Sequence, residues 1–190
     1  AGAMACDARS EDSWRFYEID PVVVRIASDP KRFRFLSVCQ PNADIVVGDA
    51  RLTVAKEPDG RFDYLVIDAF SSDSIPIHLM TEEALRLFLG KLKPDGLLAL
   101  HISNRHLHLS SVAAAVAMAI PGTHAVLITD RRENQGYDAV NSQVMFIGKS
   151  KAALGPVLSW QGASPADPAG VAHWTDDYSD ILTAIWRKYR

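Results

Sequence analysis

Three carboxylates of this chain, Glu18, Asp49 and Asp68, stand where short runs rich in apolar residues end. Runs of this length and composition are typical of strands. Where strands alternate with helices in an open sheet, ligands bind beyond the carboxyl ends of the strands. Carboxylates at that edge can accept hydrogen bonds from ribose hydroxyls or an exocyclic amine, and can take a proton from a cationic amine. The spacing therefore predicts a site for an adenosyl cofactor.

The first two carboxylates each have a second interpretation. Glu18 is placed to accept hydrogen bonds from both ribose hydroxyls. It could instead be a charge at a helix N-terminus, although Asp20, directly before Pro21, fits that role better. Asp49 follows Gly48, whose missing side chain lets backbone approach a flat ring closely. Asp49 can cap the helix that it begins and also accept a hydrogen bond from an adenine amine.

A pair of carboxylates, Asp68 and Asp73, shares the loop after the strongly apolar segment 62–67. Two carboxylates beside an apolar strand could bind a cationic amine, and one could accept its proton. Acidic loops are also common on protein surfaces. The spacing alone leaves a structural loop open as the alternative.

Polar and aromatic residues later in the chain give weaker signals. His101, Asn104, His106 and His108 follow an apolar run, but their spacing matches no zinc pattern, so we expect no metal site. His101 itself is expected to be a satisfied core or crevice residue. The segment 174–178, which contains Tyr178, could cap the last helix, or form a flap whose aromatic side chains cover the site.

The hydrophobic pattern predicts an α/β protein with an open, mostly parallel sheet and helices on both faces. The expected strands are 15–19, 43–47, 62–67, 97–102, 125–128 and 143–147. The expected helices are 22–27, 49–56, 81–92, 110–120 and one from about residue 179. Residues 131–142 are expected to be polar and mobile, and 162–170 to form a linker.

Composition limits the class of protein. The 190 residues fit a single domain over 1–190, with 48% hydrophobic and 23% charged residues. The formal net charge of -3 argues against a nucleic-acid partner. Without an apolar stretch long enough to span a bilayer, we expect a cytoplasmic domain with no direct membrane contact, possibly part of a larger membrane protein. Cys6 and Cys39 show no metal-type spacing and are expected to be reduced.

Six segments, taken in order, resemble the spermidine synthase family of aminopropyltransferases, and in particular its bacterial spermidine-synthase-like branch. They are RFYEIDP (15–21), GDAR (48–51), DYLVIDAFSSDSIP (63–76), LMTEEAL (79–85), LKPDGLLALHISNR (92–105) and WTDDYS (174–179). The resemblance covers nearly the whole chain with compatible spacing.

This resemblance implies a Rossmann-like fold of the class I S-adenosylmethionine-dependent methyltransferase type. It implies transfer of an aminopropyl group from decarboxylated S-adenosylmethionine to a di- or polyamine, as from putrescine to spermidine, without a metal and possibly in a homodimer. The residues implied for cofactor binding are Gly2, Glu18, Ile19, Asp49, Ala50 and Asp68. Asp68 and Asp73 are implied as catalytic residues, and Asp73 and Tyr178 as binding the amine.

The chain departs from the family pattern in three places. Ala1-Gly2-Ala3 corresponds to the end of the family's glycine-rich loop, so the first strand and the N-terminal β-hairpin region are expected to be missing. Ala1 stands where the family has an aspartate facing the aminopropyl group. The loop from Asp68 to Asp73 has two extra residues between its carboxylates. Two alternatives therefore stay open: an S-adenosylmethionine-dependent methyltransferase on the same fold, and a non-catalytic nucleotide-binding or interaction domain.

Overall fold

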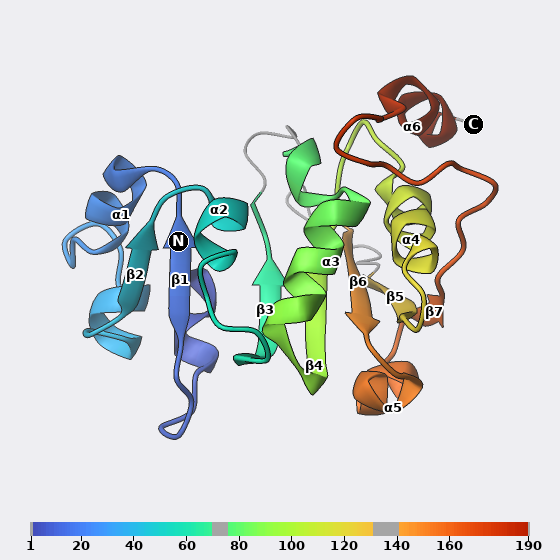
Figure 1. Cartoon of the computed structure of the whole chain (residues 1–190). Helices are drawn as coiled ribbons and strands as arrows, with labels where there is room; N and C mark the ends of the chain where they lie inside the picture. Colours follow the sequence, from blue (N-terminus) through green and yellow to red (C-terminus); the bar gives the residue numbers. More distant parts are fainter. Residues whose placement is uncertain (1, 70–75, 131–140, 190) are drawn as a thin grey trace. The chain divides into compact units, whose positions relative to one another are not determined.

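The computed structural model describes residues 2–69, 76–130 and 141–189. The chain forms two compact units, Ala1–Glu57 and Pro58–Arg190, and each is described by itself. The expectation of a single domain over 1–190 stays a prediction. The first unit is drawn in blue to teal in Figure 1, and the second in the colours from teal to red.

The first unit is built on one parallel crossover. Strand β1 (Arg15–Glu18) leads into helix α1 (Pro21–Ala27), and the chain returns as β2 (Asp44–Val47), which pairs with β1 in parallel. Helix α1 begins here because the Asp20 side chain accepts from the backbone N–H of Val22 at 2.7 Å and proline occupies the first helical position. A second short helix, α2 (Ala50–Val54), follows β2.

Two short helical turns complete this unit and are joined covalently. The 3₁₀ turn η1 (Ala3–Asp7) and the π turn η2 (Phe35–Cys39) contribute Ala5 and Leu36 to a small core. Cys6 and Cys39 form a disulfide, with Cα atoms 4.9 Å apart. The expectation of two reduced cysteines is therefore wrong. The disulfide forms because η1 packs against η2 and brings the two cysteines together. Two cysteines that lie 33 residues apart in the sequence do not by themselves indicate that packing.

The second unit holds a five-stranded mixed sheet in the order β3-β4-β6-β5-β7. Its strands are β3 (Phe62–Ile67), β4 (Leu92–His101), β5 (His124–Asp130), β6 (Ser142–Gly148) and β7 (Ala163–Pro165). β3 and β4 are parallel, whereas β6 lies between β4 and β5 and runs antiparallel to both. β3, β4 and β5 consequently point the same way. The predicted α/β class is confirmed, but the sheet of this unit is mixed: β3 pairs with β4 in parallel, whereas β6 and β7 pair antiparallel with their neighbours, which the sequence pattern did not indicate.

The edge strand β7 falls within 162–170, which was expected to be a linker. That expectation is wrong for Ala163–Pro165, which pair with Val126–Ile128 of β5. The segment can end on Pro165 because proline is tolerated in a strand at the edge of a sheet.

Helices cover both faces of this sheet. Helix α5 (Lys151–Leu154) and the 3₁₀ turn η4 (Gly155–Ser159) pack Leu154 and Val157 against one face. Helices α3 (Glu82–Lys91) and α4 (Leu109–Ala119) contact strands β4, β5 and β6, and most of the side chains of α4 are buried (Figure 1). In the central strands β4 and β6, every second side chain points to the face opposite Leu154 and Val157. The side chains on that face are fully buried: Leu98, Leu100, Met145 and Ile147.

The start of α3 is joined to the segment 174–178. The Thr81 hydroxyl caps α3 by accepting from Ala84 N at 3.3 Å, and donates to Asp176 Oδ1 at 2.7 Å. The backbone N–H of Glu82 donates to the carbonyl of Trp174 at 2.8 Å, and the Trp174 side chain is fully buried. A segment more than ninety residues away in the sequence thus completes the N-terminus of α3.

Candidate functional site

In the first unit, the structure brings Glu18 and Asp49 to the same edge of the parallel strand pair. Glu18 ends β1, and its carbonyl accepts from the backbone N–H of Gly48 at 3.0 Å, next to Asp49. The Asp49 side chain accepts from Leu52 N at 2.9 Å and so caps α2. The Glu18 side chain accepts from Asp20 N at 3.1 Å. Both carboxylates are half-buried, and each is oriented by a local backbone N–H.

The neighbours of these carboxylates differ in exposure. Ile19 follows Glu18 and is 66% exposed, so its side chain offers an apolar surface beside the carboxylate. Ala50 follows Asp49 and begins α2. Gly2 is buried with a φ of +80°, and a side chain there would bring its Cβ within 2.6 Å of Leu36. Packing against Leu36 and the positive φ therefore explain the glycine without any ligand.

In the second unit, Asp68 is paired with His101. Ile67 and Leu100 are partners in the parallel register of β3 and β4, so Asp68, which directly follows β3, lies beside His101, the last residue of β4. His101 Nδ1 lies 2.7 Å from Asp68 Oδ1, and His101 Nε2 lies 2.7 Å from Ser103 Oγ. The expectation that His101 is a satisfied crevice residue is met, since both ring nitrogens have partners.

The electrostatic effect of this pair falls on the carboxylate. The hydrogen bond from His101 lowers the pKa of Asp68 below its ordinary value, although partial burial acts in the opposite direction. Asp68 is therefore ionised at neutral pH and can hold a cation. Sequence reasoning did not find His101 as the partner of Asp68. The available signal was that Asp68 directly follows one predicted strand and His101 lies near the end of the next predicted strand.

Two further residues, Asp73 and Tyr178, were predicted from the sequence to bind the amine. Asp73 lies outside the described residues. Tyr178 is 47% exposed and exchanges backbone hydrogen bonds with Thr175 at 2.9 and 3.2 Å. The cap of the last helix, α6 (Ile181–Lys188), is Asp180, which accepts from Thr183 N at 2.9 Å. The alternative that 174–178 caps α6 is therefore wrong, and the segment binds the start of α3 instead.

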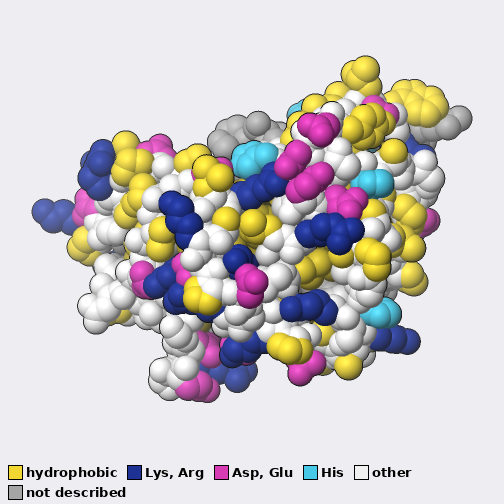
Figure 2. Space-filling view, in the orientation of Figure 1, with side chains coloured by type: hydrophobic (Ala, Val, Ile, Leu, Met, Phe, Trp, Pro, Cys, Tyr) yellow, Lys and Arg dark blue, Asp and Glu magenta, His cyan; other side chains and the backbone are white. Residues whose placement is uncertain are grey.

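Three further findings concern metal ions, surface charge and membranes. Among residues 2–69, 76–130 and 141–189, no group of three or more His, Cys, Asp or Glu is arranged to hold a metal ion. Figure 2 shows Lys and Arg side chains interspersed with acidic ones on the face in view. Within the part of the chain that the structure describes, no helix is long and apolar enough to cross a membrane.

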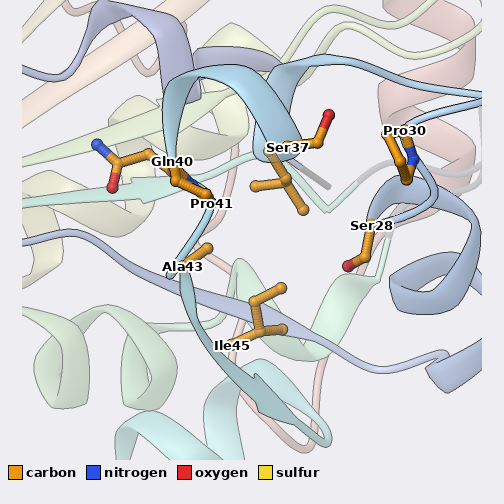
Figure 3. A pocket seen from close by; sticks show the side chains of 8 residues that line it. Ser28, Pro30, Ser37, Gln40, Pro41, Ala43 and Ile45 are labelled. Carbon is orange, nitrogen blue, oxygen red and sulfur yellow. The ribbon is translucent and has the colours of Figure 1, made fainter.

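The first unit has a hollow of about 290 Å³ (Figure 3). It is lined by Ser28, Pro30, Leu36, Ser37, Gln40, Pro41, Ala43 and Ile45. Ala43 directly precedes β2 and Ile45 is its second residue, whereas Asp49 lies beyond its end. The hollow therefore lies at the other end of the strand from the predicted cofactor residues.

Comparison with known proteins gives one sequence match and a set of structural ones. No family model matches the chain. Over 85 residues it is 38% identical to a polyamine aminopropyltransferase of Vibrio vulnificus strain CMCP6, which covers 43% of this chain and 26% of that protein. The chain thus spans about a quarter of the length of this curated relative.

Solved structures match over most of the chain. A probable spermidine synthase from Corynebacterium glutamicum has a TM-score of 0.59 at 19% identity, covering 88% of this chain and 64% of that one. The spermidine synthase from Thermotoga maritima has a TM-score of 0.56 at 17% identity, covering 90% and 56%. A spermidine synthase in complex with the transition-state analogue AdoDATO has a TM-score of 0.54 at 17% identity, covering 90% and 55%. The predicted Rossmann-like fold of the class I methyltransferase type is confirmed.

Proposed function

We propose, from the confirmed resemblance of this chain to the spermidine synthase family, that it is the adenosyl-binding and catalytic part of an aminopropyltransferase. The donor is decarboxylated S-adenosylmethionine and the acceptor is a di- or polyamine, with conversion of putrescine to spermidine as the reference reaction. The observation that carries the proposal is the ionised Asp68 at the carboxyl end of β3, held at 2.7 Å by His101.

The reaction requires an unprotonated amine. The amine nitrogen attacks the carbon beside the sulfonium, a C–N bond forms, the C–S bond breaks, and methylthioadenosine leaves with the former bonding pair on sulfur. The nitrogen loses one proton in the process. Asp68 binds the incoming ammonium and accepts its proton, while positioning supplies most of the remaining acceleration.

The other proposed residues hold the two reactants. Glu18 is proposed to bind the ribose and Asp49 with Ala50 the adenine, and Gly2 and Ile19 are proposed as further cofactor-binding residues. The half-burial of Glu18 and Asp49, and their position at one edge of the strand pair, support these roles. Asp73 and Tyr178 are proposed to bind the amine, Asp73 as the second catalytic carboxylate.

The setting of the protein also stays a proposal. A homodimer is expected, with a small-molecule amine as substrate and no nucleic acid. A cytoplasmic location remains a prediction. The disulfide between Cys6 and Cys39 weighs against it, because such bonds are rare where thiols are kept reduced.

The test is the substitution Asp68→Asn in the full-length protein, with methylthioadenosine release measured over a panel of amines. We expect the rate of aminopropyl transfer to fall by roughly 100-fold or more, because the variant has lost its proton acceptor. The affinity for the adenosyl donor, measured by calorimetry, should stay within about twofold of the wild-type value. Asp63→Asn is the matched control, because Asp63 is exposed in the first half of the same strand and pairs with Lys93.

Three outcomes would contradict the proposal. Unchanged turnover in Asp68→Asn would exclude Asp68 as the proton acceptor. Tighter binding of S-adenosylmethionine than of its decarboxylated form would favour a methyltransferase. Failure of the full-length protein to bind any adenosyl ligand would favour a non-catalytic domain.

A further inference from the structure

We infer that His101 is the positioning residue for Asp68, and that Ser103 and the backbone of Gln143 hold it in place for that role. The inference rests on the proposed function, because it assigns the residue that orients the proposed proton acceptor. It concerns residues of the second unit alone, all of them among the described residues.

The sheet itself brings these groups together. Asp68 follows β3, His101 ends β4, and Gln143 is the second residue of β6, which pairs with β4 on its other side. Ser103 lies two residues beyond His101. The site is therefore assembled from the ends of three adjacent strands, and a strand end is a more rigid support than a loop.

The hydrogen bonds run in one direction through this group. The backbone N–H of Gln143 can only donate, and it donates to Ser103 Oγ at 2.8 Å. The Ser103 hydroxyl is then free to donate to His101 Nε2, 2.7 Å away. With Nε2 accepting, a neutral ring carries its hydrogen on Nδ1 and donates it to Asp68 Oδ1 at 2.7 Å. The network thus selects one tautomer and directs its donor at the carboxylate.

This arrangement leaves Asp68 fixed but accessible. The bond at Oδ1 orients the carboxylate, while the Asp68 side chain is still 61% exposed and His101 only 30%. A hydrogen bond to the charged form also keeps the pKa of Asp68 low, which stabilises the anion that an ammonium group would meet. A purely structural link between the strands would not need the carboxylate to stay exposed.

Two substitutions at His101 separate positioning from structure. His101→Asn places an amide N–H near the position of Nδ1 and keeps a donor for Asp68. His101→Leu has similar bulk and no donor. His124→Asn is the matched control, because His124 is exposed and begins β5, level with Leu97 and therefore at the opposite end of the sheet.

The experiment measures turnover and carboxylate titration on the same full-length variants. We expect His101→Leu to lower kcat/KM for the amine by roughly 10- to 100-fold, the range for loss of a charge-assisted hydrogen bond. His101→Asn should recover most of this loss, and His124→Asn should match the wild type. By carbon-13 NMR, the pKa of Asp68 should rise in His101→Leu and stay low in His101→Asn.

The outcomes distinguish this inference from the proposed function. Wild-type kcat/KM and an unshifted Asp68 titration in His101→Leu would overturn the positioning role. Equal losses in His101→Asn and His101→Leu would also overturn it, since a role in fold alone does not depend on the donor. If no amine is turned over by the wild type but the Asp68 titration still shifts in His101→Leu, the proposed function fails and the pairing of His101 with Asp68 stands.

Discussion

The disulfide between Cys6 and Cys39 should determine much of the stability of the first unit. The perturbation is the double substitution Cys6→Ser/Cys39→Ser, or reduction of the wild type. Cys6 is exposed and Cys39 half-buried, so serine at these positions removes little buried surface. The core residues Ala5, Ala27 and Leu36 are left in place. The change in stability therefore reports the cross-link itself.

The size of the effect follows from the loop that the bond closes. For a sequence separation of 33 residues, the chain-entropy relation gives roughly 3 to 4 kcal/mol at 25 °C. A small unit with few fully buried side chains has little stability to spare. We expect the reduced first unit to open at least 100-fold more often, or to lose its protection altogether.

Native-state hydrogen exchange measures this for each unit separately. The reporters are the amide of Gln40, bonded to Leu36 O, and the amide of Ala5, bonded to Gly2 O. The amide of Ile102, bonded to Gln143 O in the second unit, is the internal control and should be unaffected. Two free thiols in the unreduced protein, or a change below about fivefold in the Gln40 and Ala5 amides, would refute the reasoning.

Two further predictions concern stability. Burial, with a hydrogen bond to Glu57, raises the pKa of Tyr17 from 10.0 to about 12. The contribution of its neutral form to the free energy of unfolding is therefore complete below pH 10 and lost between pH 10 and about 12. In a series of urea-unfolding experiments at different pH values, Tyr17→Phe should reduce the fall in the free energy of unfolding between pH 10 and about 12. The fall that remains is due to Tyr64, because burial also raises the pKa of Tyr64 to about 12. An unchanged fall would exclude Tyr17 as its source. Thr81→Val should cost roughly 1 to 2 kcal/mol, seen as a lower Tm, because it removes the cap of α3 and the bond to Asp176. Thr81→Ser keeps the hydroxyl and should be close to the wild type, whereas equal Tm values for the two variants would contradict the capping role.

Elements set by local signals were predicted well. The apolar run of β3 was found with the same bounds, Phe62–Ile67. The helix expected over 81–92 is α3, with Thr81 as its cap, and Asp20 with Pro21 was identified as the start of α1. In each case the deciding interactions lie within a few residues of one another, so the sequence around the element contains the information.

Features set by distant contacts were missed for a corresponding reason. The position of β6 between β4 and β5, the pairing of β7 and the disulfide all join segments that no local pattern relates. β4 begins at Leu92, ahead of the strand expected from residue 97, because Leu92 already pairs with Phe62 across an irregularity in the register.

In the candidate site, too, features set by local sequence were predicted and features set by distant contacts were missed. Glu18, Asp49 and Asp68 were recognised as strand-end carboxylates from the sequence, and the structure places them there. The partner of Asp68 was not recognised, because identifying His101 requires the register between two strands that are separated by a helix. The roles of all these residues remain predictions.

The insertion of β6 also sets the order in which a growing chain can fold. β4 and β5 are made before β6, yet in the described sheet neither pairs with the other, so their facing edges stay open until Gly148 has been synthesised. At ordinary rates of synthesis this interval lasts on the order of a second or more. Open edges of apolar strands are prone to pair with other chains. The nascent protein is therefore open to aggregation in the interval between the emergence of β5 from the ribosome and the emergence of Gly148.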